Sequence, residues 1–479
     1  MAGLKKNLFY NTILTISQML IPIITFPYIT RVLGPDGYGK VSFVDSIVQY
    51  IILIAALGIP IYGVREVAKV RDEPEKLSKL YTELFIIHFV LTFILSIGYI
   101  LMFLFVPKLE SSSTLFTIGI GLLYFTVLPT EWLFQGLEKM AFIVKRTLFI
   151  RIVFVVVIFL TVKSKGDINW YYSISLLMLI ANAVTNLFVS SKLVKFVLTD
   201  LDIKRHLSPL GYIFSGNLAI SVYLIMDSIL LGFFASENAV GYYTTAMRIS
   251  KIFISLVTAL SVVIIPRLSF AFRENEFEEV RRMLYKSFDY VIFLTIPISV
   301  GLYLTASEVV MLLAGKAFQP AILTVKILSP MAFIIGMASI FAYQILIPMG
   351  KEKIYLIAVT IGMFFSVTMN ILLIPEFKQN GAAFTSILTE VLVSIVAFYL
   401  SYKHFKYTIP WPSFFKALIS TVPFYPIIIL FNNNCDNLIV RLALIVSNCI
   451  LVYLAAQYFV WKNATISEGY NTLMRKFSN

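Results

Sequence analysis

Cysteine, histidine and charged residues are scarce in this chain. Two cysteines and three histidines occur among 479 residues, and Asp, Glu, Lys and Arg together make up 14%. Cys435 and Cys449 have neither the spacing of metal ligands nor the arrangement of a disulfide framework. The sequence also lacks a glycine-rich phosphate-binding loop, a zinc-ligand motif and a nucleophile elbow. It therefore predicts no catalytic site, no metal site and no cofactor, so direct use of ATP is not expected.

Long polar segments are absent too, and long apolar segments fill the chain. Hydrophobic residues make up 59% of it, and a helix needs roughly 20 apolar residues to cross a bilayer. About fourteen stretches between Leu8 and Trp461 reach this length. The expected spans are 8–30, 41–64, 80–106, 114–136, 141–163, 170–191, 210–234, 241–266, 288–312, 321–349, 354–375, 380–402, 413–431 and 438–461. The sequence therefore predicts an all-α polytopic membrane protein.

Prolines fall inside two of these spans. Pro22 and Pro27 lie in the first span, and Pro330 and Pro348 lie in the tenth. Neighbouring helices can satisfy the carbonyl groups that a proline leaves without an amide partner. We therefore expect kinks in these helices and no breaks.

Lysine and arginine are distributed unevenly between the two ends of the spans. With the N-terminus placed in the cytoplasm, roughly 26 of them fall in cytoplasmic segments and roughly seven on the opposite side. This bias predicts that both termini are cytoplasmic and that the number of spans is even. The net charge of +13 is then mainly a topology signal. A nucleic-acid partner is not expected, since no basic stripe stands on a soluble fold.

Short sequences that contain glycine or proline at the ends of the spans recur about 200 residues later in the chain. Leu33-Gly34 matches Leu231-Gly232, Gly39 matches Gly241, and Ile59-Pro60 matches Ile265-Pro266. Six spans per copy give both copies the same orientation, which is a parallel repeat with room for a cavity between two lobes. We expect a six-helix lobe at 1–206, a second at 207–408, and two extra helices with a cytoplasmic tail at 409–479.

The segment that closes the first span resembles a known signature. It reads PYITRVLGPDGYG over residues 27–39, and VGYYTTAMR at 240–248 and EWLFQG at 131–136 add to the likeness. Together they resemble the bacterial polysaccharide flippases of the multidrug/oligosaccharidyl-lipid/polysaccharide exporter superfamily. The likeness covers roughly residues 1–410.

The resemblance implies a two-lobed, V-shaped helical transporter of the bacterial inner membrane. The implied substrate is an undecaprenyl-pyrophosphate-linked oligosaccharide repeat unit, moved from the inner to the outer leaflet for O-antigen, capsule or related glycan assembly. Membrane lipid is the surrounding partner, and glycan polymerase and chain-length proteins are candidate partners.

Ionisable residues at membrane depth are the candidate site, because such residues usually face protein or a wet cavity. Arg248 is expected at the same height as Asp227 on the neighbouring span, either as a cavity cation held by this acid or as part of a structural ion pair. Lys251 lies one turn further on the same face. Arg31 and Asp45 are their weaker counterparts in the first lobe, although Arg31 could equally anchor the helix at the interface.

Three further residues lie near the middle or along the length of other spans. Arg151 is a candidate cavity cation, because a guanidinium grips phosphate oxygens through a two-donor fork; it could instead snorkel to the cytoplasm. Glu390 is a candidate for proton coupling or a permanently neutral acid. His88 could titrate, although a packing role suits it as well.

Three other functions are compared with the sequence alone. A cation-coupled multidrug exporter of the same fold would need an acidic, aromatic cavity. The cations Arg248, Lys251 and Arg151 argue against such a cavity. A lipid II-type flippase is another alternative. A membrane-embedded glycan polymerase or ligase would need a large outer loop with catalytic residues. The expected outer loops have about ten residues or fewer, so the chain is not expected to be an enzyme.

Overall fold

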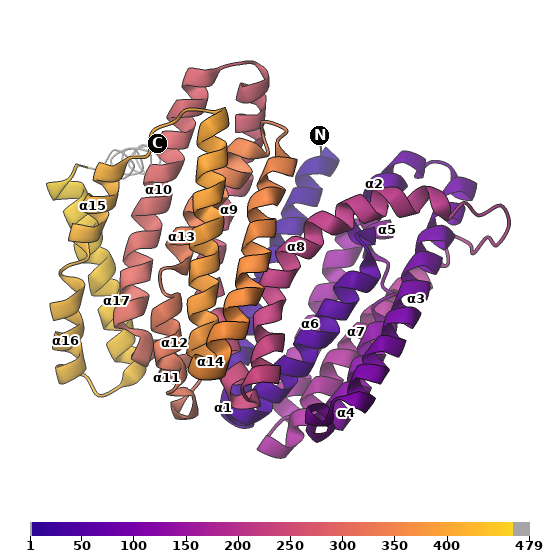
Figure 1. Ribbon diagram of the computed structural model, residues 1–479, viewed down its shortest axis with the longest axis horizontal. Helices are drawn as coiled ribbons and strands as arrows, with labels where there is room; N and C mark the ends of the chain where they lie inside the picture. The colour runs from indigo at the N-terminus through magenta and orange to yellow at the C-terminus, as the bar shows by residue number, and fades with distance from the viewer. Residues whose placement is uncertain (1, 463–479) are drawn as a thin grey trace. The chain divides into compact units, whose positions relative to one another are not determined.

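The computed structural model describes residues 2–462, apart from the side chains of 2–16, 18–20, 216–217, 219–220, 223–224 and 256–263. It is 86% helical, and the described part contains no strand. The helices are α1 (Ala2–Ala56), α2 (Ile59–Val70), α3 (Pro74–Phe105), α4 (Ser113–Phe125), α5 (Glu131–Gly136), α6 (Met140–Thr161), α7 (Ile168–Ser190), α8 (Lys204–Phe234), α9 (Glu237–Arg273), α10 (Phe277–Leu304), α11 (Ala306–Leu313), α12 (Ala321–Leu328), α13 (Met331–Ser339), the π-helix η4 (Ile340–Leu346), α14 (Glu352–His404), α15 (Trp411–Ser420), α16 (Phe424–Asn434) and α17 (Leu438–Ala455) (Figure 1).

Helix α1 contains the first two predicted spans, because it folds back on itself at Gly34. This residue has φ 69° and ψ 178°, a backbone conformation open to glycine and costly for other residues. The rings of Phe26 and Tyr38 lie 5.9 Å apart, whereas twelve residues of straight helix would separate them by roughly 18 Å. The signature segment 27–39 is therefore the turn of a helical hairpin.

Helix α14 folds back in the same way and contains the eleventh and twelfth spans. Lys378 breaks it with φ 50° and ψ −129°. A Cβ atom placed on Gly362 would lie 2.3 Å from Val393, although 31 residues of straight helix would extend roughly 46 Å. Within residues 2–462, eight helical stretches are long and apolar enough to cross a membrane, and α1 and α14 supply two of them. The prediction of an all-α polytopic membrane protein is confirmed.

The proline residues divide into two groups. Helix α1 continues through Pro22 and Pro27, as predicted. The prediction is wrong at Pro330, where α12 ends at Leu328 and α13 begins at Met331. Proline has no amide hydrogen to continue the helical ladder, and Pro330 is the N-cap of α13.

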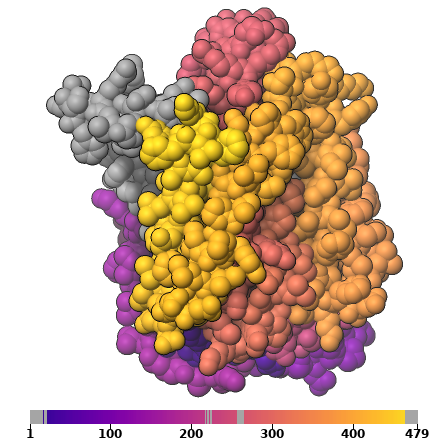
Figure 2. Space-filling view, turned by 90° about the vertical axis from the view of Figure 1, so that its left-hand side faces the viewer, coloured from indigo at the N-terminus to yellow at the C-terminus, as the bar shows by residue number. Residues whose placement is uncertain are grey.

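Within residues 2–462, spatial contacts separate two compact units, and the boundary between them falls between Gly241 and Tyr242. The predicted lobe boundary lies earlier, between 206 and 207, because the second copy of the predicted sequence repeat begins with the seventh span. Helix α8 belongs to the first unit, where it packs against α1 and α2. In the second unit α10 packs against α13 and α15, and Figure 2 shows the C-terminal helices, in yellow, covering one face of this unit. The six-helix repeat itself stays a prediction.

Two glycines that the repeat matched are neighbours in the first unit. A Cβ atom on Gly39 would lie 1.8 Å from the carbonyl oxygen of Glu237, and one on Gly241 would lie 2.3 Å from that of Pro35. The backbone after the α1 hairpin turn therefore touches the backbone at the start of α9. Only glycine permits an approach this close.

Candidate functional site

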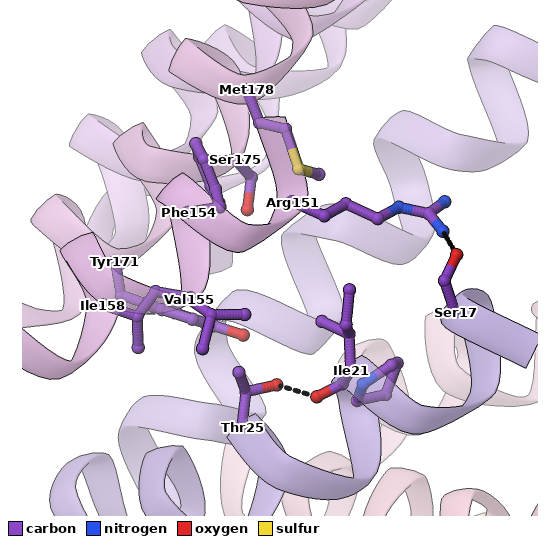
Figure 3. Close-up of a pocket in the computed structure, with 11 residues that line it drawn as sticks. Ser17, Ile21, Thr25, Arg151, Phe154, Val155, Ile158, Tyr171, Ser175 and Met178 are labelled. Carbon is purple, nitrogen blue, oxygen red and sulfur yellow. Dashed lines mark hydrogen bonds between the residues drawn. The ribbon is translucent and has the colours of Figure 1, made fainter. Parts of the chain in front are cut away.

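A cavity of about 260 Å³ opens between α1, α6 and α7 of the first unit. Figure 3 shows its polar groups, which come from all three helices. Ser17 and Thr25 lie on α1, Arg151 on α6, and Tyr171 and Ser175 on α7. Apolar side chains complete the wall: Ile21, Pro22, Phe154, Val155, Ile158 and Met178. The cavity thus combines one cation with several hydroxyl groups in a largely apolar frame.

Arg151 is the charged group of this cavity. Its side chain is half-buried, and Nη1 donates a hydrogen bond of 2.9 Å to the hydroxyl oxygen of Ser17 (Figure 3). Thr25 is occupied locally, since its hydroxyl donates to the carbonyl of Ile21 at 3.1 Å. A guanidinium has five N–H donors in a planar fork, so several donors of Arg151 remain available for oxygen atoms of an anion. The cavity can therefore bind a phosphate-like group.

The two weaker candidates of the first unit do not line this cavity. The Arg31 side chain is exposed, and its Nη1 donates to the carbonyl oxygen of Pro27 at 3.3 Å, one turn earlier in the same helix. Asp45 is half-buried, and its Oδ1 lies 3.4 Å from the hydroxyl of Tyr172 and 3.5 Å from the amide nitrogen of Gln49. Both distances are long for hydrogen bonds.

The predicted pair of Asp227 and Arg248 falls on the two different units. Asp227 lies on α8 with 2% of its surface exposed. Arg248 and Lys251 lie on α9 in the second unit, one turn apart, and both side chains are exposed. The pairing of Asp227 with Arg248 stays a prediction.

Glu390 and His88 are both buried, with 6% and 9% of their surfaces exposed. Glu390 lies on the second half of α14, after the break at Lys378. His88 lies in the middle of α3. The coupling roles suggested for both residues stay predictions.

Arg146 is a buried cation of α6 that the sequence analysis does not single out. It is 7% exposed and lies at the end of the second turn of α6. Its Nη2 donates to Glu131 Oε1 at 2.5 Å and to the Thr147 hydroxyl at 3.0 Å, and its Nη1 donates to Asn186 Oδ1. The amide of Asn186 in turn donates to the carbonyl of Pro129. This cluster ties α5, α6 and α7 together, and the acid in the EWLFQG segment is its sequence signal.

A second buried network joins the start of α8 to α2 and α3. Glu83 is fully buried; its Oε2 accepts from Arg205 Nη2 at 2.6 Å and from His206 Nε2 at 2.8 Å. Its Oε1 accepts from the backbone N–H of Asp202 at 2.7 Å. With Nε2 protonated, the other ring nitrogen of His206 accepts from the Tyr62 hydroxyl at 2.7 Å. An acid at the start of an apolar run was the only signal in the sequence for this network.

An apolar cavity of about 590 Å³ lies in the second unit. Its walls come from α9, α10, α11, α16 and α17, and they carry almost only apolar side chains. Phe293 and Ile298 of α10 face it from one side, and Ile445, Cys449 and Tyr453 of α17 from another. The helices beyond the predicted repeat thus help to enclose a space suited to a hydrocarbon group.

Comparison with known families decides where this chain belongs. The model of the family described as "Polysaccharide biosynthesis protein" matches residues 4–272, which is more than half of the 479 residues. The chain belongs to this family. The matched region includes the signature turn at 27–39, the α1–α6–α7 cavity and all of α8.

This member of the polysaccharide biosynthesis protein family has a relative of nearly the same extent. It is 26% identical over 398 residues to a protein of Escherichia coli (strain K12) named "Putative O-antigen transporter", and the match covers 82% of this chain and 95% of the relative.

Solved structures share its fold. A lipid II flippase MurJ in an inward closed conformation matches with a TM-score of 0.77 and 15% identity, covering 95% of this chain and 99% of that one. An inward-facing multidrug resistance MATE family transporter of the MOP superfamily matches with a TM-score of 0.62 and 14% identity, covering 81% and 94%. At these identities the likeness establishes a common fold and leaves the substrate open.

Proposed function

We propose that this protein is a flippase for undecaprenyl-pyrophosphate-linked oligosaccharide repeat units. It moves them from the inner to the outer leaflet of the bacterial inner membrane by alternating access, driven by an ion gradient, with both termini in the cytoplasm. The observation that carries the proposal is the guanidinium of Arg151, held by Ser17 in a largely apolar cavity between α1, α6 and α7. Keeping a cation at membrane depth costs about 2.5–3.5 kcal/mol on insertion scales. Binding of an anion would offset this cost, which favours an anionic substrate.

The other parts of the substrate match other features of the chain. A pyrophosphate offers oxygen pairs to the fork of Arg151, and sugar hydroxyls can exchange hydrogen bonds with the hydroxyl groups of Tyr171 and Ser175. The apolar cavity beside α16 and α17 suits the polyprenyl chain. The relationship to a protein named as an O-antigen transporter, over 82% of this chain, supports the same substrate class.

The cations and acids of the second unit complete the proposal. Arg248 and Lys251, exposed on α9, add positive charge for the pyrophosphate or for acidic sugars. Glu390, buried on α14, exchanges the coupling proton, because burial disfavours the charged carboxylate and contact with water favours it, so a change of access changes whether the proton is held.

A flipping assay in liposomes tests the proposal. Purified protein is reconstituted with a fluorescent undecaprenyl-pyrophosphate oligosaccharide, and the outer-leaflet pool is quenched over time with and without a proton gradient. Wild type is expected to transfer the lipid faster than empty liposomes do. Losing a charged hydrogen bond costs about 1.5–3 kcal/mol, so Arg151→Ala and Arg248→Ala should each slow transfer by about tenfold or more.

The matched control is Arg267→Ala, which removes an arginine that is 72% exposed and paired with Glu279 outside the cavity. Its rate should equal that of wild type. Glu390→Gln should retain slow transfer and lose the response to the gradient. A wild-type rate equal to that of empty liposomes overturns the flippase, whereas normal transfer by Arg151→Ala overturns only the role of this residue.

A further inference from the structure

A basic pocket lies at the end of the first unit where α3 begins and the loop after α7 passes. Its volume is about 690 Å³. Four lysines line it, two from the first turns of α3 and two from the loop: Lys76, Lys79, Lys192 and Lys195. Two acids, Glu75 and Asp200, line it as well. This end of the unit is the one that the distribution of lysine and arginine places at the cytoplasm.

The loop that forms one wall is held to α3 by a row of hydrogen bonds. The backbone N–H of Lys195 donates to the Ser78 hydroxyl at 3.1 Å, and that of Val197 donates to the Thr82 hydroxyl at 3.1 Å. The bond from Asp202 to Glu83, already described, continues the row. Ser78 and Thr82 are buried side chains one helical turn apart. The hydrogen bonds therefore hold the loop that forms one wall of the pocket in place against α3.

Three of the four lysines that line the pocket form none of the ion pairs found among the described residues, although two acids line it as well. Lys76 pairs with Glu73 at 2.6 Å. None of the ion pairs found in residues 2–462 involves Lys79, Lys192 or Lys195. Lys79 is half-buried, which lowers the screening of its charge by water. The pocket is thus prepared for an anion.

Large exposed apolar side chains lie in the same loop and at the end of α7. Phe196 is 57% exposed and Leu198 is 78% exposed, both in the loop, and Phe188 at the end of α7 is 65% exposed. The ammonium group of Lys192 lies 4.3 Å from the ring centre of Phe188. The ring of Phe196 packs against the ring of Tyr81 of α3, with ring centres 5.5 Å apart. Exposed apolar groups beside lysines are the pattern of a membrane interface.

We propose that this pocket binds the phosphate headgroup of an anionic phospholipid of the cytoplasmic leaflet. The lysines contact the phosphate, and Phe196 and Leu198 contact the first part of the acyl chains. The ligand is a membrane lipid and not a soluble phosphate, because the exposed apolar residues Phe196 and Leu198 alternate along the loop with the lining residues Lys195, Val197 and Thr199. The site lies apart from the Arg151 cavity, so it is independent of the transported substrate.

Native mass spectrometry of the detergent-purified full-length protein tests this site. Phosphatidylglycerol and phosphatidylethanolamine with identical acyl chains are titrated separately, and the dissociation constants are compared. The variant Lys79→Gln/Lys192→Gln/Lys195→Gln removes three charges, each worth about fivefold in affinity near a membrane surface. We expect its dissociation constant for phosphatidylglycerol to rise at least tenfold, with phosphatidylethanolamine unaffected. The triple Lys→Arg variant should bind phosphatidylglycerol as wild type does, which separates loss of charge from loss of fold.

The matched control is Lys351→Gln/Lys353→Gln/Lys403→Gln, which removes the same charge from predicted cytoplasmic positions outside the pocket. It should leave the affinity for phosphatidylglycerol unchanged. Leu198→Ser should weaken phosphatidylglycerol binding and leave the charge intact. Equal losses in the two triple Gln variants, equal binding of the two lipids, or displacement of phosphatidylglycerol by excess inorganic phosphate would each overturn the proposal.

Discussion

The buried carboxylate of Glu83 gives a sharp test of how the first unit is held together. Its two oxygens accept three hydrogen bonds, and two of the donors, Arg205 and His206, lie at the start of α8. The third donor is the backbone of Asp202 in the loop that precedes this helix. In Glu83→Gln one oxygen becomes an NH₂ donor, which must face either a side-chain donor or the Asp202 amide. At least one charge-assisted hydrogen bond is therefore lost.

The size of the effect follows from this count. A hydrogen bond to a charged group contributes about 1.5–3 kcal/mol, and each 1.36 kcal/mol is a factor of ten in an equilibrium constant. Local opening of the loop 191–203 should become roughly ten- to 150-fold more frequent in Glu83→Gln. Hydrogen–deuterium exchange measured by mass spectrometry reports this opening directly, because the amides of Lys195, Val197 and Asp202 are all bonded to α3.

The control is Glu138→Gln in the same unit. Glu138 is 64% exposed and pairs with Arg71 at 2.8 Å, and an exposed pair of this kind contributes about 0–1 kcal/mol. Its loss should leave exchange in the loop within a few-fold of wild type. If Glu83→Gln and Glu138→Gln gave the same exchange in peptides that cover 194–203, the argument that Glu83 anchors the loop would be refuted.

Two further predictions concern packing and buried charge. Gly39→Ala should sharply lower the yield of folded protein in size-exclusion chromatography, because its Cβ would lie 1.8 Å from the Glu237 carbonyl oxygen. The control Gly301→Ala, whose Cβ would have nothing within 4 Å, should leave the yield unchanged. Equal yields of the two variants would contradict the close contact at Gly39. Glu131→Gln should lower the apparent melting temperature in detergent more than Arg146→Met does. Glu131→Gln leaves Arg146, whose side chain is 4% exposed, without its carboxylate, at a cost of about 3–5 kcal/mol. Arg146→Met leaves Glu131, whose side chain is 43% exposed and therefore solvated. The reverse order would show that Glu131 does not compensate Arg146.

The spans were predictable from the sequence because hydropathy over roughly 20 residues is set by the bilayer and needs no knowledge of neighbours. The hairpin turn at Gly34 fell between two predicted spans for the same reason. The break at Pro330 was not predictable, because a proline bends or ends a helix according to what neighbouring groups satisfy its free carbonyl. Local sequence carries no information on those neighbours.

The candidate site was predictable only in part. Arg151 stands out in the sequence as a cation inside an apolar run, and the structure places it in a cavity. Arg146 is only five residues earlier in the same predicted span and does not stand out, since its partners Glu131 and Asn186 come from other helices. The role of Glu83 depends on Arg205 and His206, more than 120 residues away. Pairings over such distances come from the tertiary fold and leave no periodic pattern in the chain.

Transport of two substrates by the same proteoliposomes tests the central claim most directly. One preparation of wild-type protein is loaded in parallel with a fluorescent undecaprenyl-pyrophosphate oligosaccharide and with a cationic dye, and the initial transfer rates are compared with those of empty liposomes. A flippase with a cationic cavity around Arg151 should raise the rate for the lipid-linked oligosaccharide and leave that of the dye unchanged. Transport of the dye without transfer of the lipid-linked oligosaccharide would contradict the account and establish a drug exporter in its place.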